Sequence, residues 1–140
     1  MKVLLPVDGS PFTKRMLGWV AAHDEIFGPG HDYLAFTALP PIPAYAARFV
    51  DRTILDGHYA EQAEAVLQPL RAFAAQQGWR LRTAFAPGHA AEAIAECAAA
   101  EKPDLIVMGT HGHSALAGAM LGSVAAGVLA RCKLPVLFVR

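Results

Sequence analysis

The sequence has no excess of charge of either sign. Lys and Arg together number 12, as do Asp and Glu, so the formal net charge is zero. A protein that attracts nucleic acid or an anionic membrane through its overall field needs a surplus of basic residues. The charge balance therefore argues against nucleic acid as a partner.

Cysteine is scarce as well. The only two, Cys97 and Cys132, are far apart and have no spacing typical of a metal or redox motif. Cys97 falls in an alanine-rich helical run and Cys132 at a predicted helix end, so we interpret both as small core residues. Because unpaired cysteines are typical of a reducing compartment, we expect a cytoplasmic protein.

Long apolar runs are also missing. Met1–Val7 is too short to predict a signal peptide. The uncharged stretch His113–Ala130 contains Gly118 and Gly122 at the spacing by which membrane helices dimerise. It is nevertheless rich in Ala, Gly and Ser and barely reaches ~18 residues, the lower limit for a span. We therefore expect no membrane span.

What the sequence does contain is a regular alternation of buried-strand and helical patterns. We predict strands at Lys2–Val7, Asp32–Leu39, Trp79–Ala86, Asp104–Gly109 and Pro135–Arg140, and helices at Pro11–Phe27, Gly57–Gln77, Gly88–Ala100 and Ser123–Arg131. The strand at Trp79–Ala86 alternates apolar residues with Arg, which indicates an edge strand. The alternation predicts an α/β fold in one domain, residues 1–140, with an open five-stranded parallel sheet and helices on both faces.

Two segments interrupt this regularity. Pro69 lies inside a predicted helix and should kink or split it. The prolines at positions 40, 41 and 43 exclude a central strand or a regular helix there. We predict a loop or short irregular helix from Pro40 to about Asp56, which is either a flap over a site or an interface element.

The candidate site combines two loops that follow strands. Asp8-Gly9-Ser10 follows the first strand, and a glycine-rich segment from Gly109 to Gly122 follows the fourth and precedes a helix. In an open α/β sheet with right-handed crossovers, the first and fourth strands are neighbours at a switch point, where ligands bind. Free N–H groups at a helix start suit a phosphate, and a carboxylate suits hydroxyl donors. This arrangement predicts a nucleotide site.

The common phosphate and catalytic motifs do not fit. No Lys follows the glycines as a Walker A loop requires, and Asp8-Gly9-Ser10 is not a dinucleotide turn. Gly112-His113-Ser114-Ala115-Leu116 lacks the final glycine of a nucleophile elbow. Ser10 and Ser123 are better interpreted as helix caps or phosphate contacts, because no base stands beside either. We therefore predict no catalytic residues.

Two histidines in the glycine-rich segment leave a choice between a metal and a phosphate. His111 and His113 could act together as an H-x-H metal pair. No cysteine or carboxylate cluster stands nearby, so we favour histidines close to a phosphate and predict no metal site.

The glycine spacing resembles a family signature. Gly109, two residues, Gly112, nine residues and then Gly122-Ser123 are similar to the nucleotide-binding pattern G-x2-G-x9-G-S/T of the universal stress proteins. The resemblance covers essentially the whole chain, including the first strand, the run Gly88–Ala98, the segment Pro103–Gly109 and the ending Cys132–Val139. It implies a Rossmann-like, adenine nucleotide alpha hydrolase-like sheet of order 3-2-1-4-5. It also implies a homodimer paired through the last strands, Pro135–Arg140.

The resemblance further implies a pocket for ATP or AMP, with or without Mg²⁺, in a regulatory or sensing protein with at most slow ATP hydrolysis. Asp8 would accept hydrogen bonds from the adenine or ribose, and Ala38 would lie against the base. The whole implied contact set is Pro6, Val7, Asp8, Ala38, Met108, Gly109, His111, Gly112, Gly122, Ser123 and Val124. The last three would offer backbone N–H groups and one hydroxyl to the phosphates.

The chain departs from the family pattern after Val124. Many nucleotide-binding members carry a hydroxyl residue and then an acidic residue, where this chain has Ala125 and Ala126. One phosphate contact and one helix-cap partner are therefore missing. A second interpretation stays open, in which the chain is a stress-response interaction module of the same fold that binds no nucleotide.

Overall fold

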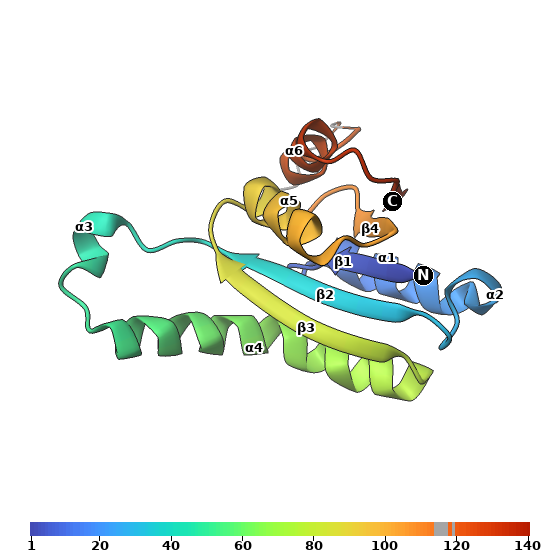
Figure 1. The fold of residues 1–140 in the computed structure, drawn as a ribbon, viewed down its shortest axis with the longest axis horizontal. Helices are drawn as coiled ribbons and strands as arrows, with labels where there is room; N and C mark the ends of the chain where they lie inside the picture. Colours follow the sequence, from blue (N-terminus) through green and yellow to red (C-terminus); the bar gives the residue numbers. More distant parts are fainter. Residues whose placement is uncertain (114–117, 119) are drawn as a thin grey trace.

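The computed structural model describes residues 1–113, 118 and 120–140 (Figure 1). The elements are β1 (Lys2–Pro6), α1 (Pro11–Ala22), α2 (Asp24–Phe27), β2 (Asp32–Leu39), α3 (Ala44–Ala47), α4 (Arg52–Gln77), β3 (Arg80–Pro87), α5 (Ala90–Glu101), β4 (Leu105–Gly109), α6 (Ser123–Arg131) and β5 (Val136–Val139). The five strands form a parallel sheet of order β3-β2-β1-β4-β5. This confirms the predicted fold class and strand order.

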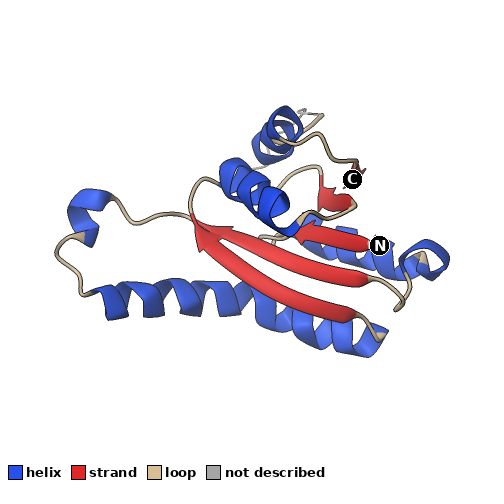
Figure 2. Cartoon of the chain, in the orientation of Figure 1, coloured by secondary structure: helices blue, strands red, loops and turns tan. Residues whose placement is uncertain are grey.

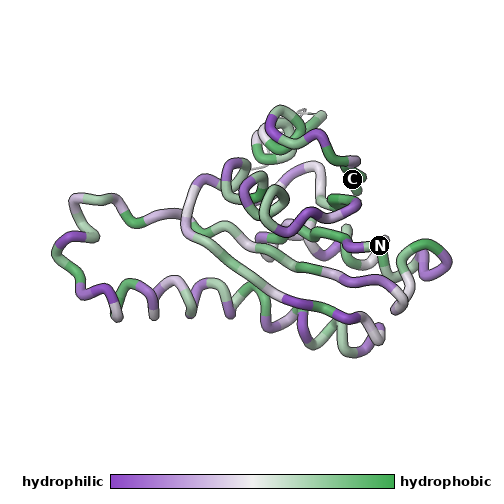
Figure 3. The backbone as a smooth tube through the Cα atoms, in the orientation of Figure 1, coloured by the Kyte–Doolittle hydropathy of each residue, from purple (hydrophilic) through white to green (hydrophobic). Residues whose placement is uncertain are grey.

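The central strands are apolar on both sides because helices cover both faces of the sheet (Figure 2). Val3 and Leu5 of β1 pack into one cluster with residues of α1 and α4, and Leu4 packs into a second cluster with residues of α5 and α6. Successive strand residues point to opposite faces, so a continuous apolar run supplies both cores. The hydrophobic colour along β1 in Figure 3 follows from this double burial.

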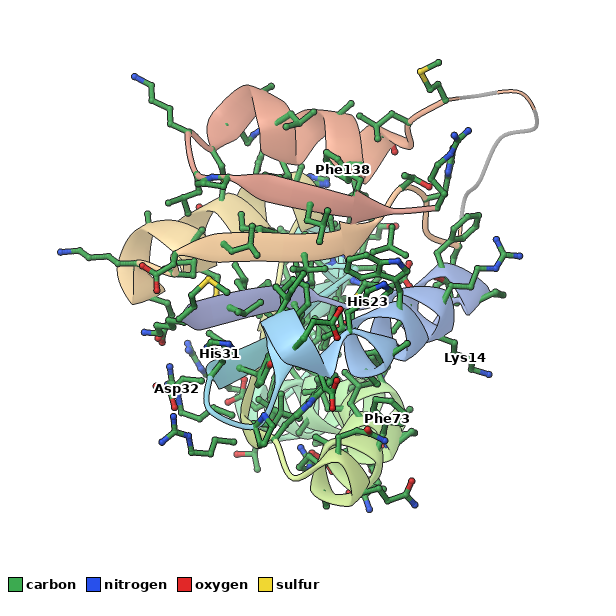
Figure 4. All side chains as sticks on the ribbon, turned by 90° about the vertical axis from the view of Figure 1, so that its right-hand side faces the viewer. Lys14, His23, His31, Asp32, Phe73 and Phe138 are labelled. Atoms are coloured by element: carbon green, nitrogen blue, oxygen red, sulfur yellow. The ribbon has the colours of Figure 1, made fainter. Side chains whose placement is uncertain are left out.

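The outer strands differ from the centre. Exposed and part-buried residues alternate along much of β3, as predicted for an edge strand. β5 forms the other edge, and its Phe138 packs into the cluster that includes α6 residues (Figure 4). Cys97 in α5 and Cys132 after α6 are half-buried against that cluster, and burial raises the pKa of both thiols. Both cysteines therefore lie where small core residues were predicted.

The predicted helix Pro11–Phe27 is two helices. α1 starts as expected, with the Ser10 hydroxyl accepting a hydrogen bond from the Thr13 N–H and Pro11 in the first turn. It ends at Ala22, because His23 takes a non-helical conformation and its Nδ1 lies 2.7 Å from the Trp19 carbonyl oxygen. Phe27, at the end of the short α2, is still buried, so the apolar spacing continues across the break.

α4 is longer and more regular than predicted. It begins at Arg52, five residues before the expected Gly57, because the Asp51 side chain caps it by accepting a hydrogen bond from the Thr53 N–H at 2.8 Å. Of the two effects predicted at Pro69, the split is wrong, since the helix continues through this residue, and the kink stays a prediction. Pro69 lies on the exposed side, where water can satisfy the carbonyl that proline leaves without a donor.

Residues 40–58, which we call the arm, connect β2 to the buried part of α4. The arm contains the short α3 and the first turns of α4, and Figure 1 shows it projecting beyond the sheet. None of its residues is buried, whereas Leu39 and Tyr59 on either side of it are. The Ile42 N–H donates a hydrogen bond to the Tyr59 hydroxyl at 2.8 Å. This bond connects the segment that enters the arm to the helix that leaves it.

No helix among the described residues is long and apolar enough to cross a bilayer. Residues 114–117 and 119, which belong to the stretch considered above for a membrane span, lie outside the described residues.

One charged cluster links the amino-terminal ends of the strands to α5, and it predicts a pH effect. The Glu101 carboxylate accepts hydrogen bonds from Arg82 of β3 at 2.7 Å and from Lys2 of β1 at 2.8 Å, and these bonds lower the pKa of Glu101 to about 2. A carboxyl group with a depressed pKa in the folded state stabilises the fold above its ordinary pKa of 4.5, and this contribution is lost as the pH falls toward 2.

The free energy of unfolding of the wild type should therefore fall more steeply between pH 4.5 and 2 than that of Glu101→Gln, as measured by urea denaturation. Glu96→Gln is the matched control, because Glu96 is exposed on the same helix and takes part in no ion pair among the described contacts. The same steepness in the wild type and Glu101→Gln would contradict this prediction.

Candidate functional site

A cavity of about 460 Å³ opens at the carboxyl ends of β1, β2 and β4. This volume lies within the range of roughly 300–1,000 Å³ found for small-molecule sites. All eleven residues of the predicted contact set line it, namely Pro6, Val7, Asp8, Ala38, Met108, Gly109, His111, Gly112, Gly122, Ser123 and Val124. The structure thus brings the two predicted loops to one hollow, while their role in binding stays a prediction.

Asp8 stands at the end of β1 and organises the start of α1. Its Oδ1 accepts hydrogen bonds from the Ser10 N–H and the Thr13 hydroxyl, both at 2.9 Å, and its own N–H donates to the Thr13 hydroxyl at 3.1 Å. The bond to an N–H two residues later is an Asx turn, a local structure favoured by Asp. Asp8 therefore stabilises the start of α1 and also lines the cavity.

The electrostatics of Asp8 favour its ionised form. Burial raises the pKa of the carboxyl group, but hydrogen bonds from Ser10 and Thr13 and the nearby His113 outweigh burial and lower the pKa overall. The carboxylate is consequently charged at neutral pH and can only accept hydrogen bonds. Only one hydrogen bond, from the His113 N–H at 3.2 Å, reaches its Oδ2 among the described contacts. This oxygen can accept from a ligand hydroxyl or amine as well.

The loop after β4 is tied to the end of β1 through His113. The His113 ring Nε2 lies 2.6 Å from the carbonyl oxygen of Asp8. A carbonyl oxygen only accepts, so Nε2 must be the protonated nitrogen that donates. The His113 backbone N–H also donates to Asp8 Oδ2. These two contacts hold the loop after β4 against the loop after β1, as the predicted site requires.

The signature glycines allow three close approaches within the protein. A Cβ atom at Gly112 would overlap the Asp8 carboxylate, one at Gly109 would come within 2.9 Å of the Phe12 Cβ, and one at Gly122 within 2.9 Å of the Thr110 carbonyl oxygen. None of the three has a positive φ, so the requirement is for space. The glycines therefore shape the cavity wall itself, and do more than leave room for a ligand.

The far wall of the cavity is the first turn of α6. Gly122 is its N-cap residue, and its own N–H donates to the Thr110 carbonyl at 2.7 Å. No side chain caps this helix, so the N–H groups of the first turn have no partner within it. Ser123 and Val124 line the cavity at this point. An unsatisfied helix start of this kind attracts an anion.

His111 offers one further unsatisfied group. Its Nδ1 lies 3.1 Å from the Thr110 hydroxyl, and its ring centroid lies 5.2 Å from that of Phe12. Its Nε2 is buried without a hydrogen-bond partner in the described part of the chain. Because a buried polar atom without a partner costs free energy, a ligand that bonds to it would be favoured.

Several lining residues were not predicted. They are Thr13, Phe36, Thr37, Leu39, Pro40, Gln62, Val66, Ala90, Ile94 and Ala125. His113, which was predicted with His111 to lie close to a phosphate, also lines the cavity. Thr13 follows the capping Ser10 at a typical spacing and could have been inferred from it, whereas Gln62 and Val66 lie on a helix with no motif of its own. Ala125 is buried, so the cavity wall is apolar at this position.

Cations are absent from the described lining of the cavity, which includes no Lys or Arg. No group of three or more His, Cys, Asp or Glu side chains among the described residues could hold a metal ion. An anionic ligand would therefore depend on helix and loop N–H groups, on the two histidines, or on a metal ion that it brings with it.

Comparison with known proteins identifies relatives over the full length. The model of the universal stress protein family matches residues 1–140. A universal stress protein encoded in the QAH/OAS sulfhydrylase 3′ region of Thermus aquaticus is 35% identical over 140 residues, covering 99% of this chain and 97% of that protein.

Solved structures show the same fold. The hypothetical protein MJ0577 matches with a TM-score of 0.81 at 25% identity, covering 99% of this chain and 94% of its own. A universal stress protein in complex with cAMP matches with a TM-score of 0.66 at 27% identity, covering 100% and 96%. An Arabidopsis thaliana family member with AMP bound has a TM-score of 0.71 at 17% identity, covering 99% and 90%. By its full-length family match and its sequence relatives, the chain belongs to the universal stress protein family.

Proposed function

We propose that this chain binds an adenine nucleotide, ATP or AMP, in the cavity and acts as a nucleotide-sensing regulatory protein in a stress response. The observation that carries the proposal is the meeting of Asp8, the signature glycines and the uncapped start of α6 around one hollow of suitable volume. Two universal stress proteins of the same fold were crystallised with cAMP and with AMP, which supports an adenosine phosphate as the ligand class.

The geometry suggests how the ligand would lie. Apolar residues at the ends of β1, β2 and β4, including Val7, Ala38 and Met108, offer flat contacts for a base. Asp8 Oδ2 can accept from the ribose or the base, and His111 Nε2 provides a buried polar atom that has no partner among the described residues. The first turn of α6 would then receive the phosphates. In this arrangement these residues bind and orient the nucleotide.

Fast phosphoryl transfer is not part of the proposal. Such enzymes stabilise the transferred phosphoryl group with Lys, Arg and bound Mg²⁺, and the described lining of this cavity includes no Lys or Arg. With Mg²⁺ bound to ATP, hydrolysis would at most be slow.

Direct binding measurements test the proposal. Titration of the purified chain with ATP-Mg²⁺ or AMP in a calorimeter should give a dissociation constant below about 1 mM, equivalent to about −4.1 kcal/mol. GTP-Mg²⁺ is the matched control for the base, and native mass spectrometry of the protein as purified should show adenine nucleotide carried through purification. Flat titrations with both adenine nucleotides would overturn the proposal.

The second candidate function is an interaction module that binds no nucleotide. Ala125 and Ala126 favour it, because the first turn of α6 lacks the hydroxyl and the acidic group found in many nucleotide-binding members. If the titrations are flat and the protein still associates with itself or with a partner, this function replaces the first.

The proposal includes a cytoplasmic homodimer paired through β5. The hydrogen bonds from the Ile106 N–H to Pro135 and from the Thr110 N–H to Val139 show which residues of β5 face β4. Backbone groups of alternate residues point to opposite sides of a strand, so the N–H groups of Val136 and Phe138 face outward. An unpaired strand edge of this kind is a template for pairing with a second copy.

A further inference from the structure

The arm, residues 40–58, carries an apolar patch that the fold does not use. Tyr45 is 67% exposed, Phe49 83%, Val50 38% and Ile54 66%. Together these four side chains expose on the order of 450 Å² of largely apolar surface, which is within the range of the largest patch on a typical monomer, about 300–600 Å² and often functional.

The patch is presented on a defined support. Backbone hydrogen bonds from Ala46, Ala47 and Arg48 back to Pro43 and Ala44 form α3, and the Asp51 cap begins α4 directly after it. The Ile42–Tyr59 hydrogen bond fixes the base of the arm. Presenting apolar side chains on preformed helices reduces the ordering cost of docking.

The arm is not placed to cover the protein's own cavity. Figure 1 shows α3 and the first turns of α4 extending away from the sheet, and α4 runs without a break from the arm into the buried core. Only the base of the arm, at Pro40, lines the cavity. The partner of the patch therefore has to be another molecule.

We propose that this partner is a second copy of the chain, docked arm against arm about a two-fold axis. The arm carries Arg48 and Arg52 together with Asp51 and Asp56, two charges of each sign beside the apolar patch. Within one copy Arg52 lies 4.0 Å from the Asp56 carboxylate, but both side chains are largely exposed and can exchange this contact for one across an interface. A two-fold interface places the same surface on both sides, so each arginine can meet an aspartate of the other copy.

The charge balance also distinguishes this partner from a lipid surface. Peripheral membrane segments combine apolar residues with a surplus of Lys and Arg, whereas the charges in the arm sum to zero. An interface between two identical surfaces needs equal numbers of acidic and basic residues, and no surplus of Lys and Arg. The whole chain is likewise neutral, so no net repulsion opposes the approach of two copies.

The size of the patch sets the strength of the contact. Two arms with about 450 Å² each would bury at most about 900 Å² in total, less than the roughly 1,200–2,000 Å² of stable specific interfaces and in the range of weak, transient ones. The association should therefore be reversible and depend on protein concentration. It uses a different part of the molecule from β5, so pairing through one does not require pairing through the other.

Sedimentation equilibrium of the full chain tests the proposal. The double substitution Phe49→Asp with Ile54→Asp should weaken self-association at least tenfold, whereas Ile26→Asp, on the exposed face of α2, should leave it unchanged. Val136→Pro removes an outward N–H of β5. Dimers that form through the arm should persist in this variant, whereas dimers that form through β5 should be lost. The experiment therefore tests the arm contact separately from the β5 homodimer.

A charge-reversal pair makes the test specific for like-with-like docking. Arg48→Glu with Arg52→Glu leaves only acidic charges on the arm, and Asp56→Lys gives it a basic surplus, without touching the Asp51 cap. Each variant alone should associate less than the wild type, and an equimolar mixture should recover association. Unchanged association in the Phe49/Ile54 variant would overturn the proposal. The Val136→Pro variant provides a second outcome that would overturn it. If this variant does not self-associate but binds anionic vesicles through the arm, the partner is a lipid surface and not a second copy.

Discussion

Gly112→Val is expected to abolish adenine-nucleotide binding, with a fall in affinity of at least 100-fold, or about 2.7 kcal/mol. Even the first added carbon at this position would overlap the Asp8 carboxylate. Either the carboxylate rotates away or the loop after β4 moves outward. Rotation of the carboxylate breaks its bond from the His113 N–H and turns the ligand-facing oxygen away, whereas outward movement of the loop also breaks the contact between the His113 ring and the Asp8 carbonyl. Either movement disrupts the wall on which the proposed ligand depends.

Calorimetric titration with ATP-Mg²⁺ and AMP measures this effect, and circular dichroism shows that the variant is folded. Gly18→Val is the matched control, because Gly18 lies in α1 with no atom within 4 Å of an added Cβ and makes no contact with the cavity. A folded Gly112→Val protein that binds nucleotide within a few-fold of the wild type would show that the contact between Asp8 and the glycine loop is not needed for binding.

The largest expected effect on stability lies between α5 and α6. A Cβ at Gly127 of α6 would come within 2.5 Å of the Ala91 Cβ on α5, closer than carbon atoms can pack. Gly127→Val should therefore force the helices apart and lower the free energy of unfolding by about 3 kcal/mol. For a chain of this length, that corresponds to a fall in melting temperature of roughly 9 °C. Thermal and urea denaturation measure both quantities.

A double-mutant cycle separates this clash from the intrinsic preference for alanine in a helix. Gly127→Ala alone should destabilise the protein, although the same change at the unobstructed Gly18 should stabilise it by about 0.5–1 kcal/mol. Combining Gly127→Ala with Ala91→Gly moves the methyl group from one helix to the other, and should recover stability with a coupling energy of about 1–3 kcal/mol. Additive effects of the two changes would contradict a direct contact.

The fold was predictable because both faces of the sheet are covered. Continuous apolar strands alternating with helices are compatible with few topologies, and the bounds of β2 and α6 agree with those predicted. The break after Ala22 was missed because Phe27, beyond it, stays buried and so preserves the apolar spacing. The early start of α4 was missed for the opposite reason. Its first turns contain no fully buried residue and only Leu55 packs against the core there, so the clearest signal was the capping Asp51.

The candidate site was predictable where it depends on strand ends and glycines, since topology brings these together. It was less predictable where a neighbouring helix contributes. Gln62 and Val66 reach the cavity only because α4 crosses the sheet at a particular angle, and no local pattern encodes that angle. The wrong prediction of a split at Pro69 has a similar origin. Proline removes one hydrogen bond from a helix and its ring crowds the preceding turn, but buried residues on either side, such as Leu67 and Leu70, hold the helix together through it.

α4 joins two regions that are otherwise remote from each other. Val66 forms part of the cavity wall, and about 21 Å further toward its amino-terminal end the same helix carries the tip of the arm. The helix is continuous between them, and its first buried residue is Tyr59. The arm-to-arm docking proposed above would therefore connect the cavity walls of two copies through two continuous helices.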